Sequence, residues 1–463
     1  MPEVTASKKE IWTMGSYSLL TLSIMVGFMY LNQFATEVLQ VPAAALATAM
    51  LIGKTIDFIV SVFCGAIIEK VKLGNKGKNQ EWLSMGRWLL AIVIMLEVFP
   101  TSGSVFMRLL IMTVAYAILN SLMNLIQTAY YGISAAVAGP NPANRQAFNI
   151  NMSRQATVIT LITSFIPTLV TALTFGKWNY FVVATAFMIP MPFALGAIAK
   201  LADGKDAPVG AAGSVHQVSA VDMFKSLGEN KYLMVLFLCH TIQYIGQFLS
   251  QGLVAYYWIF VIGNFSMMTV SNLIAAVTSF IAAMIMPPIG QKLGKKRAIS
   301  IGYFLLPVVY LAMGYFGRFG MWYMIIIASL NTFAMYTYTP FVMLMYMDAA
   351  EWYFNKSGKD TRGIVMGLAT PPMKIGMALG GTIGLTLLAA TGFTTQPPAD
   401  IAAWIPKFMT VTYWVPACFY LVMAILFVLF YRLSDEEAAR CAQENYAKFM
   451  AAQQQTAEAE KAE

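Results

Sequence analysis

The chain has 463 residues, of which 58% are apolar and only 11% are charged. Soluble domains carry about 25% charged residues, and no aqueous domain of this length can bury so many apolar side chains. The composition therefore excludes a soluble enzyme, a disordered chain and a secreted disulfide scaffold, and it indicates a polytopic membrane protein.

Apolar runs of membrane-spanning length recur twelve times between polar or Gly- and Pro-containing breaks. Backbone groups in lipid must find partners inside the protein, and the alternation typical of a β-barrel is absent, so we expect an all-α fold. The predicted spans are 11–35, 42–68, 83–100, 105–137, 155–175 and 178–199 in the first half, then 232–262, 268–290, 299–316, 321–347, 363–391 and 404–432 in the second.

The formal net charge of +8 has a topological explanation. With the N-terminus placed inside, 24 of the 30 lysines and arginines fall in segments on the cytoplasmic side. This positive-inside bias predicts a multi-pass protein of the cell inner (cytoplasmic) membrane with both termini cytoplasmic. A nucleic-acid binder would cluster these charges on one folded module, so we expect the lipid bilayer and not nucleic acid as a partner.

The longest internal polar stretch divides the spans six and six. We predict an N-terminal six-helix bundle over 1–200, a cytoplasmic linker over 201–231, a C-terminal six-helix bundle over 232–433 and a cytoplasmic tail over 434–463. Basic loops follow the second and the eighth spans at matching places. This arrangement is typical of two parallel repeats, as in transporters of the major facilitator fold.

Ionisable residues inside spans are costly and mark candidate sites. Lys54 and Asp57 lie three residues apart, on one face of the second span, where they either glue helices as an ion pair or bind a cation. Lys374 follows Thr370 by four residues in the eleventh span, with two prolines between them. That pair is either a kink with a snorkelling lysine or part of a site, and the depth of Lys374 favours a site.

Weaker candidates are polar residues at helical spacing. Arg154 is expected to begin the fifth span and to face either the cytoplasm or a central cavity. Asn120, Asn124 and Gln127 share one face of the fourth span, with Thr128 beside them, and His240, Gln243 and Gln247 form a stripe in the seventh. Such stripes form interhelical hydrogen bonds or line a cavity. No motif of an enzyme, a metal site or a phosphate loop is present, so we expect neither enzymatic activity nor a cofactor.

Several fragments, taken in order and spacing, carry a family resemblance: Phe28-Met-Tyr-Leu with Thr36-Glu37, Lys54-Thr-Ile-Asp57, Asn75-Lys-Gly-Lys78, Met347-Asp348-Ala-Ala-Glu351-Trp352 with Arg362, and Thr370-x-x-x-Lys374. On these motifs the chain resembles the glycoside–pentoside–hexuronide:cation symporters, the melibiose-carrier branch of the major facilitator superfamily. The resemblance runs nearly end to end. It implies twelve helices in two bundles and cation-coupled (H⁺ or Na⁺) symport of a sugar or sugar derivative by alternating access.

The resemblance also implies roles for individual residues. Asp57 and Ser61 match the cation site. Residues expected at the substrate site are Lys54, Asn124, Thr128, Arg154, Thr370 and Lys374, and those expected in cytoplasmic gating are Asp348, Glu351 and Arg362. The coupling ion is the only cofactor-like partner expected.

Departures from the family pattern point to the substrate. The family has a second acid four residues after the first, where this chain has Ser61. Lys54, Arg154 and Lys374 then stand against Asp57 alone, and a buried excess of positive charge needs neutralisation. An anionic sugar, a hexuronide or a sulfo-sugar, would supply it. Two alternatives remain: an uncoupled facilitator, and a membrane sensor that keeps the carrier fold.

Overall fold

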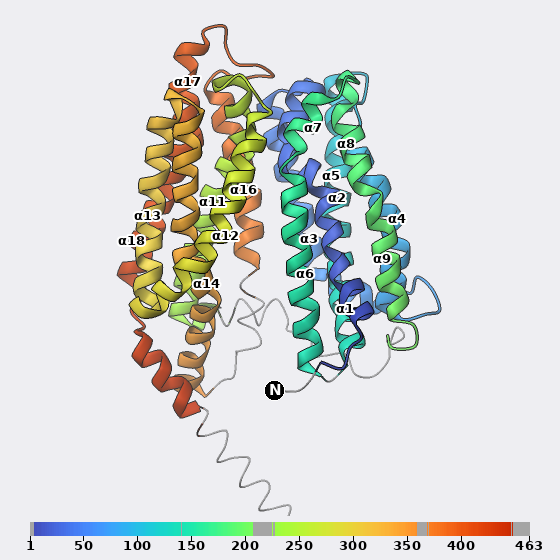
Figure 1. Ribbon diagram of the computed structural model, residues 1–463, viewed down its shortest axis with the longest axis vertical. Helices are drawn as coiled ribbons and strands as arrows, with labels where there is room; N and C mark the ends of the chain where they lie inside the picture. The colour runs from blue at the N-terminus through green and yellow to red at the C-terminus, as the bar shows by residue number, and fades with distance from the viewer. Residues whose placement is uncertain are drawn as a thin grey trace, which may run out of the picture. The chain divides into compact units, whose positions relative to one another are not determined.

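The computed structural model describes residues 4–139, 141–206, 225, 227–358, 368, 370–445 and 447, and these contain helices and turns but no strand. The first half holds α1 (Lys8–Gly15), η1 (Ser16–Ser18), α2 (Leu19–Gln33), η2 (Phe34–Val38), α3 (Ala43–Lys70), α4 (Lys78–Glu97), α5 (Val105–Ala138), α6 (Pro142–Thr163), α7 (Ile166–Ala172), η3 (Gly176–Trp178), α8 (Asn179–Met188) and α9 (Pro190–Leu201). The second half holds α11 (Lys231–Tyr256), η4 (Tyr257–Val261), α12 (Met267–Leu293), α13 (Lys295–Phe316), η5 (Gly317–Phe319), α14 (Met321–Ser357), α16 (Pro371–Ala390), α17 (Ile401–Met409), η6 (Thr410–Trp414) and α18 (Val415–Phe430) (Figure 1).

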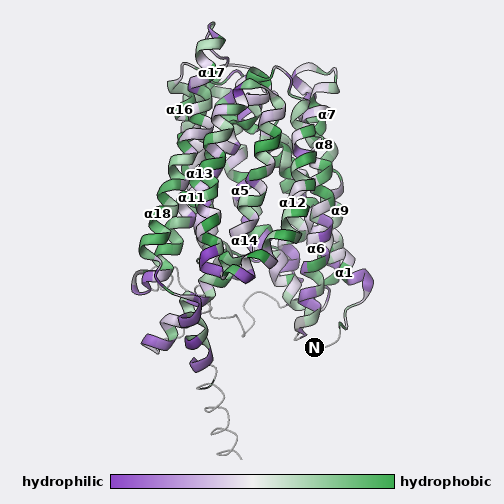
Figure 2. Cartoon of the chain, turned by 60° about the vertical axis from the view of Figure 1, so that its left-hand side comes forward, coloured by the Kyte–Doolittle hydropathy of each residue, from purple (hydrophilic) through white to green (hydrophobic). Residues whose placement is uncertain are grey.

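Within the described residues, eleven helical segments are long and apolar enough to cross a membrane. The predicted third span is the exception, because its helix α4 carries Glu81, Arg87 and Glu97. This helix packs against α5, α8 and α9, so its polar residues have protein neighbours. Figure 2 shows apolar residues along most of the helical length and hydrophilic ones gathered at α1 and in the helical stretch after α18.

Two predicted spans begin or end elsewhere in the structure. The fifth begins at Pro142, where the Asn141 side chain accepts a hydrogen bond from the amide of Ala143 as an N-cap. Arg154 therefore lies in the middle of α6, not at its start as predicted. The helix of the tenth span continues to Ser357 and ends at Gly358, which has the left-handed φ of 73° that glycine permits.

The chain forms two compact units that cut across the predicted second bundle. The first unit comprises Met1–Gln217, Gln251–Ala276 and Gly381–Phe408, and the second comprises Val218–Ser250, Val277–Gly380 and Met409–Glu463. The domain boundaries at 200, 231 and 433 stay a prediction. Residues 207–224, 226, 446 and 448–463, parts of the predicted linker and tail, lie outside the described residues.

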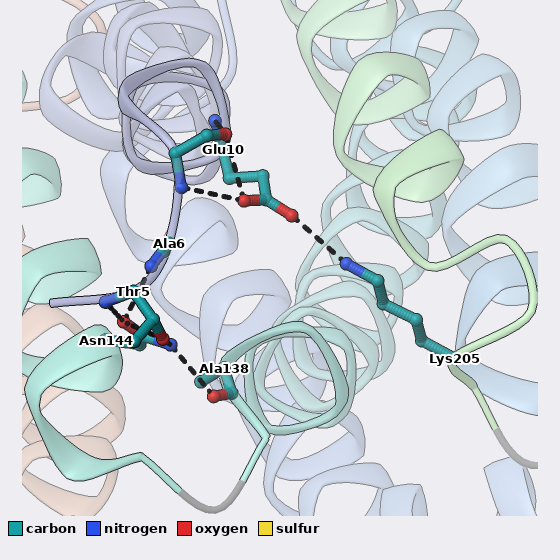
Figure 3. Close-up of polar contacts among 7 residues, drawn as sticks. Thr5, Ala6, Glu10, Ala138, Asn144 and Lys205 are labelled. Atoms are coloured by element: carbon teal, nitrogen blue, oxygen red, sulfur yellow. Dashed lines mark hydrogen bonds and ion pairs between the residues drawn. The ribbon is translucent and has the colours of Figure 1, made fainter.

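The N-terminal segment is held to the first unit by hydrogen bonds (Figure 3). The amides of Thr5 and Ala6 both donate to Oδ1 of Asn144, at 2.9 Å each, and the Asn144 amide donates to the carbonyl of Ala138. Glu10, which forms a capping box with Ser7, pairs with Lys205 at 3.1 Å. These contacts connect α1 to the α5–α6 turn and to the segment after α9.

Candidate functional site

Polar side chains connect α3 with α5, the helices of the predicted second and fourth spans. The Lys54 ammonium donates to Oδ1 of Asn120 at 2.6 Å and lies 3.9 Å from Oδ2 of Asp57. The Asn124 amide donates to Oδ1 of Asp57 at 2.6 Å. Both charged side chains are buried, with exposed fractions of 5% for Lys54 and 6% for Asp57. Lys54 and Asp57 are three residues apart and share one face of α3, and Asn120 and Asn124 are four apart and share one face of α5. The two faces are turned toward each other.

The ammonium of Lys54 also lies 5.0 Å from the centroid of the Tyr116 ring. A cation above an aromatic face is attracted by the ring quadrupole. Lys54 therefore has an anion, an amide oxygen and a ring as partners, all within the first unit. These contacts join α3 to α5. They also keep the Asp57 carboxylate away from water, where an unpaired charge would be costly.

The hydroxyl groups of Ser61 and Thr128 form hydrogen bonds mainly within their own helices. The Ser61 hydroxyl donates to the carbonyl of Phe58 within α3. Thr128 donates to the carbonyl of Asn124, and its hydroxyl lies 3.2 Å from the thiol of Cys64. These contacts extend the α3–α5 seam by one turn.

Glu97 is a buried acid that the sequence patterns did not single out. It is the last residue of α4 and is only 3% exposed. A Cβ atom built at Gly27 of α2 would lie 2.0 Å from its Oε2, so the glycine makes room for the carboxyl group. Its place near the end of a predicted span made Glu97 resemble a surface residue. An acid within an apolar run nevertheless marks a candidate site, and that is the signal by which it could have been found. The expectation that Asp57 alone stands against the positive charges within the spans is therefore wrong, because Glu97 is buried as well.

Arg154 borders a polar stripe on α6. Residues exposed along one face of this helix recur at helical spacing, namely Gln146, Asn149, Ser153, Thr157 and Thr160. A polar face on a membrane-spanning helix is unfavourable against hydrocarbon and is typical of a water-filled path. Arg154 is exposed beside this stripe and, among the described residues, has no hydrogen-bond or ion-pair partner.

The remaining predicted substrate residues belong to the second unit. Thr370 is exposed directly before α16, and its carbonyl accepts from the amide of Met373. Lys374 is half-buried in the first turns of α16. The described helix begins at Pro371, so the two prolines occupy the first turn, where proline is tolerated, and do not kink the interior.

The gating candidates also have partners within the second unit. Asp348 pairs with Lys295 at the start of α13. The Glu351 carboxylate accepts from the amide of Asn445 at 2.6 Å, in the helical stretch 435–445 after α18. Arg362 lies outside the described residues, and a gating role for these three residues stays a prediction.

His240 is enclosed by tyrosines. Its Nδ1 lies 2.8 Å from the hydroxyl of Tyr346 and its Nε2 lies 3.1 Å from the hydroxyl of Tyr303. Gln243, one turn along α11, donates to Tyr338 at 2.8 Å. One ring nitrogen of a neutral imidazole donates and the other accepts, so the two hydroxyls satisfy it without a charge. His240 and Gln243 of the stripe in the seventh span thus form helix–helix hydrogen bonds.

Contacts inside the first unit join the predicted outward ends of several spans. Asn32 donates to the carbonyl of Gly252 at 3.0 Å, and the hydroxyls of Thr36 and Tyr256 lie 2.9 Å apart. The hydroxyl of Thr168 donates to that of Thr269 at 2.8 Å. The ends of the first and fifth spans are therefore bonded to the seventh and eighth.

An apolar groove in the first unit differs in character from these polar positions. It measures about 830 Å³, lies along α3 and α5, and is lined by apolar residues that include Ile52, Ile56, Phe106 and Leu110. Apolar residues exposed in a membrane-spanning segment suit lipid, and a sugar needs hydrogen-bonding groups. We therefore assign no sugar site to this groove.

Comparison with known proteins agrees with the helical architecture. A lactose permease of Leuconostoc lactis is 22% identical over 401 residues, which cover 83% of this chain and 61% of the permease. A "Putative sulfoquinovose importer" of Salmonella typhimurium is 20% identical and covers 90% of this chain and 88% of its own length. The crystal structure of a D-xylose–proton symporter has the same fold, with a TM-score of 0.65 at 11% identity, and covers 91% of this chain and 97% of its own.

The model of one family matches nearly the whole chain. Its description is MFS/sugar transport protein, and it spans residues 13–435. That range includes each candidate residue described above. The chain therefore belongs to the MFS/sugar transport protein family, and it is a multi-pass membrane transporter of sugar-like small molecules, not an enzyme.

Proposed function

We propose that this protein is a proton-coupled symporter of a sugar derivative, located in the cytoplasmic membrane with both termini in the cytoplasm. The buried Lys54–Asp57 pair, at 3.9 Å, is the observation that carries the proposal. A fixed ammonium beside the carboxylate repels a second cation such as Na⁺, whereas a proton neutralises the carboxylate without adding a ligand. Asp57 is the proton acceptor in this proposal, and solute binding depends on its charge.

An anionic sugar is the substrate class that we propose. Lys54 is matched by Asp57 and no longer counts as excess charge, so the support comes from Arg154. Arg154 has no charged partner in the described part of the chain and borders the polar stripe of α6. A guanidinium binds carboxylate or sulfonate groups through charge-assisted hydrogen bonds. The similarity to a protein named as a sulfoquinovose importer, a sulfonated sugar, is consistent with this class.

Uptake by purified protein in liposomes tests both parts. Lactose, a glucuronide and sulfoquinovose are offered under an imposed pH gradient or an imposed Na⁺ gradient. We expect accumulation of an anionic solute under the pH gradient only. Accumulation of lactose alone contradicts the anionic substrate, uptake that ignores both gradients identifies a facilitator, and absence of counterflow for every solute identifies a sensor.

Asp57→Asn gives the sharpest single-residue prediction. The amide stays a hydrogen-bond partner for Asn124 but takes up no proton, so gradient-driven accumulation should disappear while solute exchange partly persists. Asp400→Asn is the matched control, because the Asp400 side chain caps the start of α17 by accepting from the Ala403 amide, and asparagine caps equally well. Equal loss of accumulation and exchange in the Asp57 variant would show that Asp57 is structural.

A further inference from the structure

Glu97 is a carboxyl group to which the resemblance and the comparisons assign no role. It ends α4, it is 3% exposed, and its Oε2 occupies the space that a side chain at Gly27 would need. Burying an ionised carboxylate in an apolar interior is costly unless an opposite charge or a proton neutralises it. The bare face of α2 at Gly27 supplies neither.

Charged and polar neighbours connect Glu97 to the α3–α5 seam. The positive charge of Lys54 acts on the Glu97 carboxyl, and the Tyr116 phenol interacts electrostatically with both Glu97 and Asp57. Tyr116 also lies beneath the Lys54 ammonium, at 5.0 Å. Side chains from α3, α4 and α5 thus form one electrostatic cluster, named here the acid–lysine cluster: Lys54, Asp57, Glu97 and Tyr116.

Helices α2, α5, α8 and α9 also pack against α4. Helix α2 carries Tyr30, and α5 carries Arg108, whose guanidinium donates to the carbonyls of Gly103 and Leu39. Helix α8 carries Tyr180 as its only titratable residue, and Tyr180 interacts with Glu37. Helix α9 carries only Lys200, in its last turn. Among the described residues named here, the acid–lysine cluster therefore contains one ammonium and two carboxyl groups.

Counting these charges determines where a proton belongs. With both acids ionised the cluster has a net charge of −1, and one bound proton makes it neutral. Asp57 already has the Lys54 ammonium at 3.9 Å and accepts the Asn124 amide at 2.6 Å, so the positive charge of the cluster is matched at Asp57. The proton is thus favoured on Glu97.

We propose that Glu97 is the second carboxyl group of the coupling site and carries the proton while Lys54 pairs with Asp57. When a proton from water binds an Asp57 oxygen, Lys54 loses its partner and stabilises ionised Glu97, which releases its own proton to water. One proton enters and one leaves, and Lys54 stays an ammonium throughout. This inference rests on the proposed proton-coupled function and adds a residue to it.

Infrared difference spectroscopy of the full-length protein in lipid vesicles tests this assignment without any solute. The observable is the C=O stretch of a protonated carboxylic acid, followed as the pH is changed. We expect the wild type to show this band at neutral pH and Glu97→Gln to lose it. In Asp57→Asn the band should titrate at a lower pH, because Lys54 then has Glu97 as its carboxylate partner. A wild-type band that persists in Glu97→Gln, or an unshifted midpoint in Asp57→Asn, overturns the inference.

Controls separate this result from misfolding and from the proposed function. Glu81→Gln removes an acid near the start of the same helix, where it accepts from the Lys76 amide, and should leave the band unchanged. If Glu97→Gln fails to fold, Glu97→Asp keeps a carboxyl group and should shift the frequency and midpoint, and identical values overturn the inference. A Glu97 band without proton-driven uptake refutes the symport and leaves the protonation of Glu97 standing, whereas uptake with no such band refutes the inference alone.

Discussion

The acid–lysine cluster of the first unit holds formal charges, whereas the cluster around His240 in the second unit holds neutral groups. Lys54 and Asp57 are 5% and 6% exposed, and His240 is 4% exposed, so burial is nearly equal. His240 has two tyrosine hydroxyls as hydrogen-bond partners and needs no charge. Lys54 is stabilised by opposite charge, so its environment changes whenever a proton is bound or lost. Polar groups that are equally buried thus have different roles. The neutral hydrogen bonds of His240 hold helices together, whereas the ion pair of Lys54 and Asp57 can respond to a proton.

Removing the charge of Lys54 should have the largest effect. Lys54→Met leaves Asp57 buried without its ammonium, and breaking a buried ion pair costs about 3–5 kcal/mol in the free energy of unfolding. Equilibrium unfolding in mixed micelles measures it. The double variant with Asp57→Asn should recover most of the loss, because no unpaired charge remains. A single variant as stable as the wild type would contradict the charged character of this cluster.

Removing one hydroxyl from the His240 cluster should cost less. Tyr346→Phe deletes the partner of Nδ1, and a buried polar atom left without a partner costs about 1–3 kcal/mol. The same unfolding measurement checks this value, with exposed Tyr315→Phe as the control. Because the cluster is neutral, proton-driven uptake should be unchanged when corrected for the amount of folded protein. A loss of coupling would show that His240 carries protons after all.

A contact of the N-terminal segment provides the low end of the scale. Asn144→Ala removes the acceptor of the Thr5 and Ala6 amides, and hydrogen bonds of this kind contribute about 0.5–1.5 kcal/mol each. We expect faster amide exchange of residues 5 and 6 by hydrogen–deuterium exchange, and nearly unchanged exchange in α3 and α5. Protection of these two amides equal to that in the wild type would show that other contacts hold the segment.

Local periodicity predicted much of the charged cluster. The spacing of Lys54 and Asp57, and that of Asn120 and Asn124, indicated two polar faces, and the structure pairs these faces. Periodicity did not give the direction of the Ser61 hydroxyl, which bonds within its own helix. It also did not single out Glu97, whose neighbours Gly27 and Lys54 come from other helices.

The sequence alone determined the helices, because apolar length acts locally on each span, and its loop charges predicted the sidedness of the chain. It also determined which residues share a helical face, since that depends only on spacing. Tertiary structure alone decided which faces meet, Glu97 with the acid–lysine cluster and His240 with two tyrosines, and it left the polar face of α6 beside Arg154 exposed. The physical reason is that the charge state of a buried group depends on neighbours from other helices, and only packing brings those together.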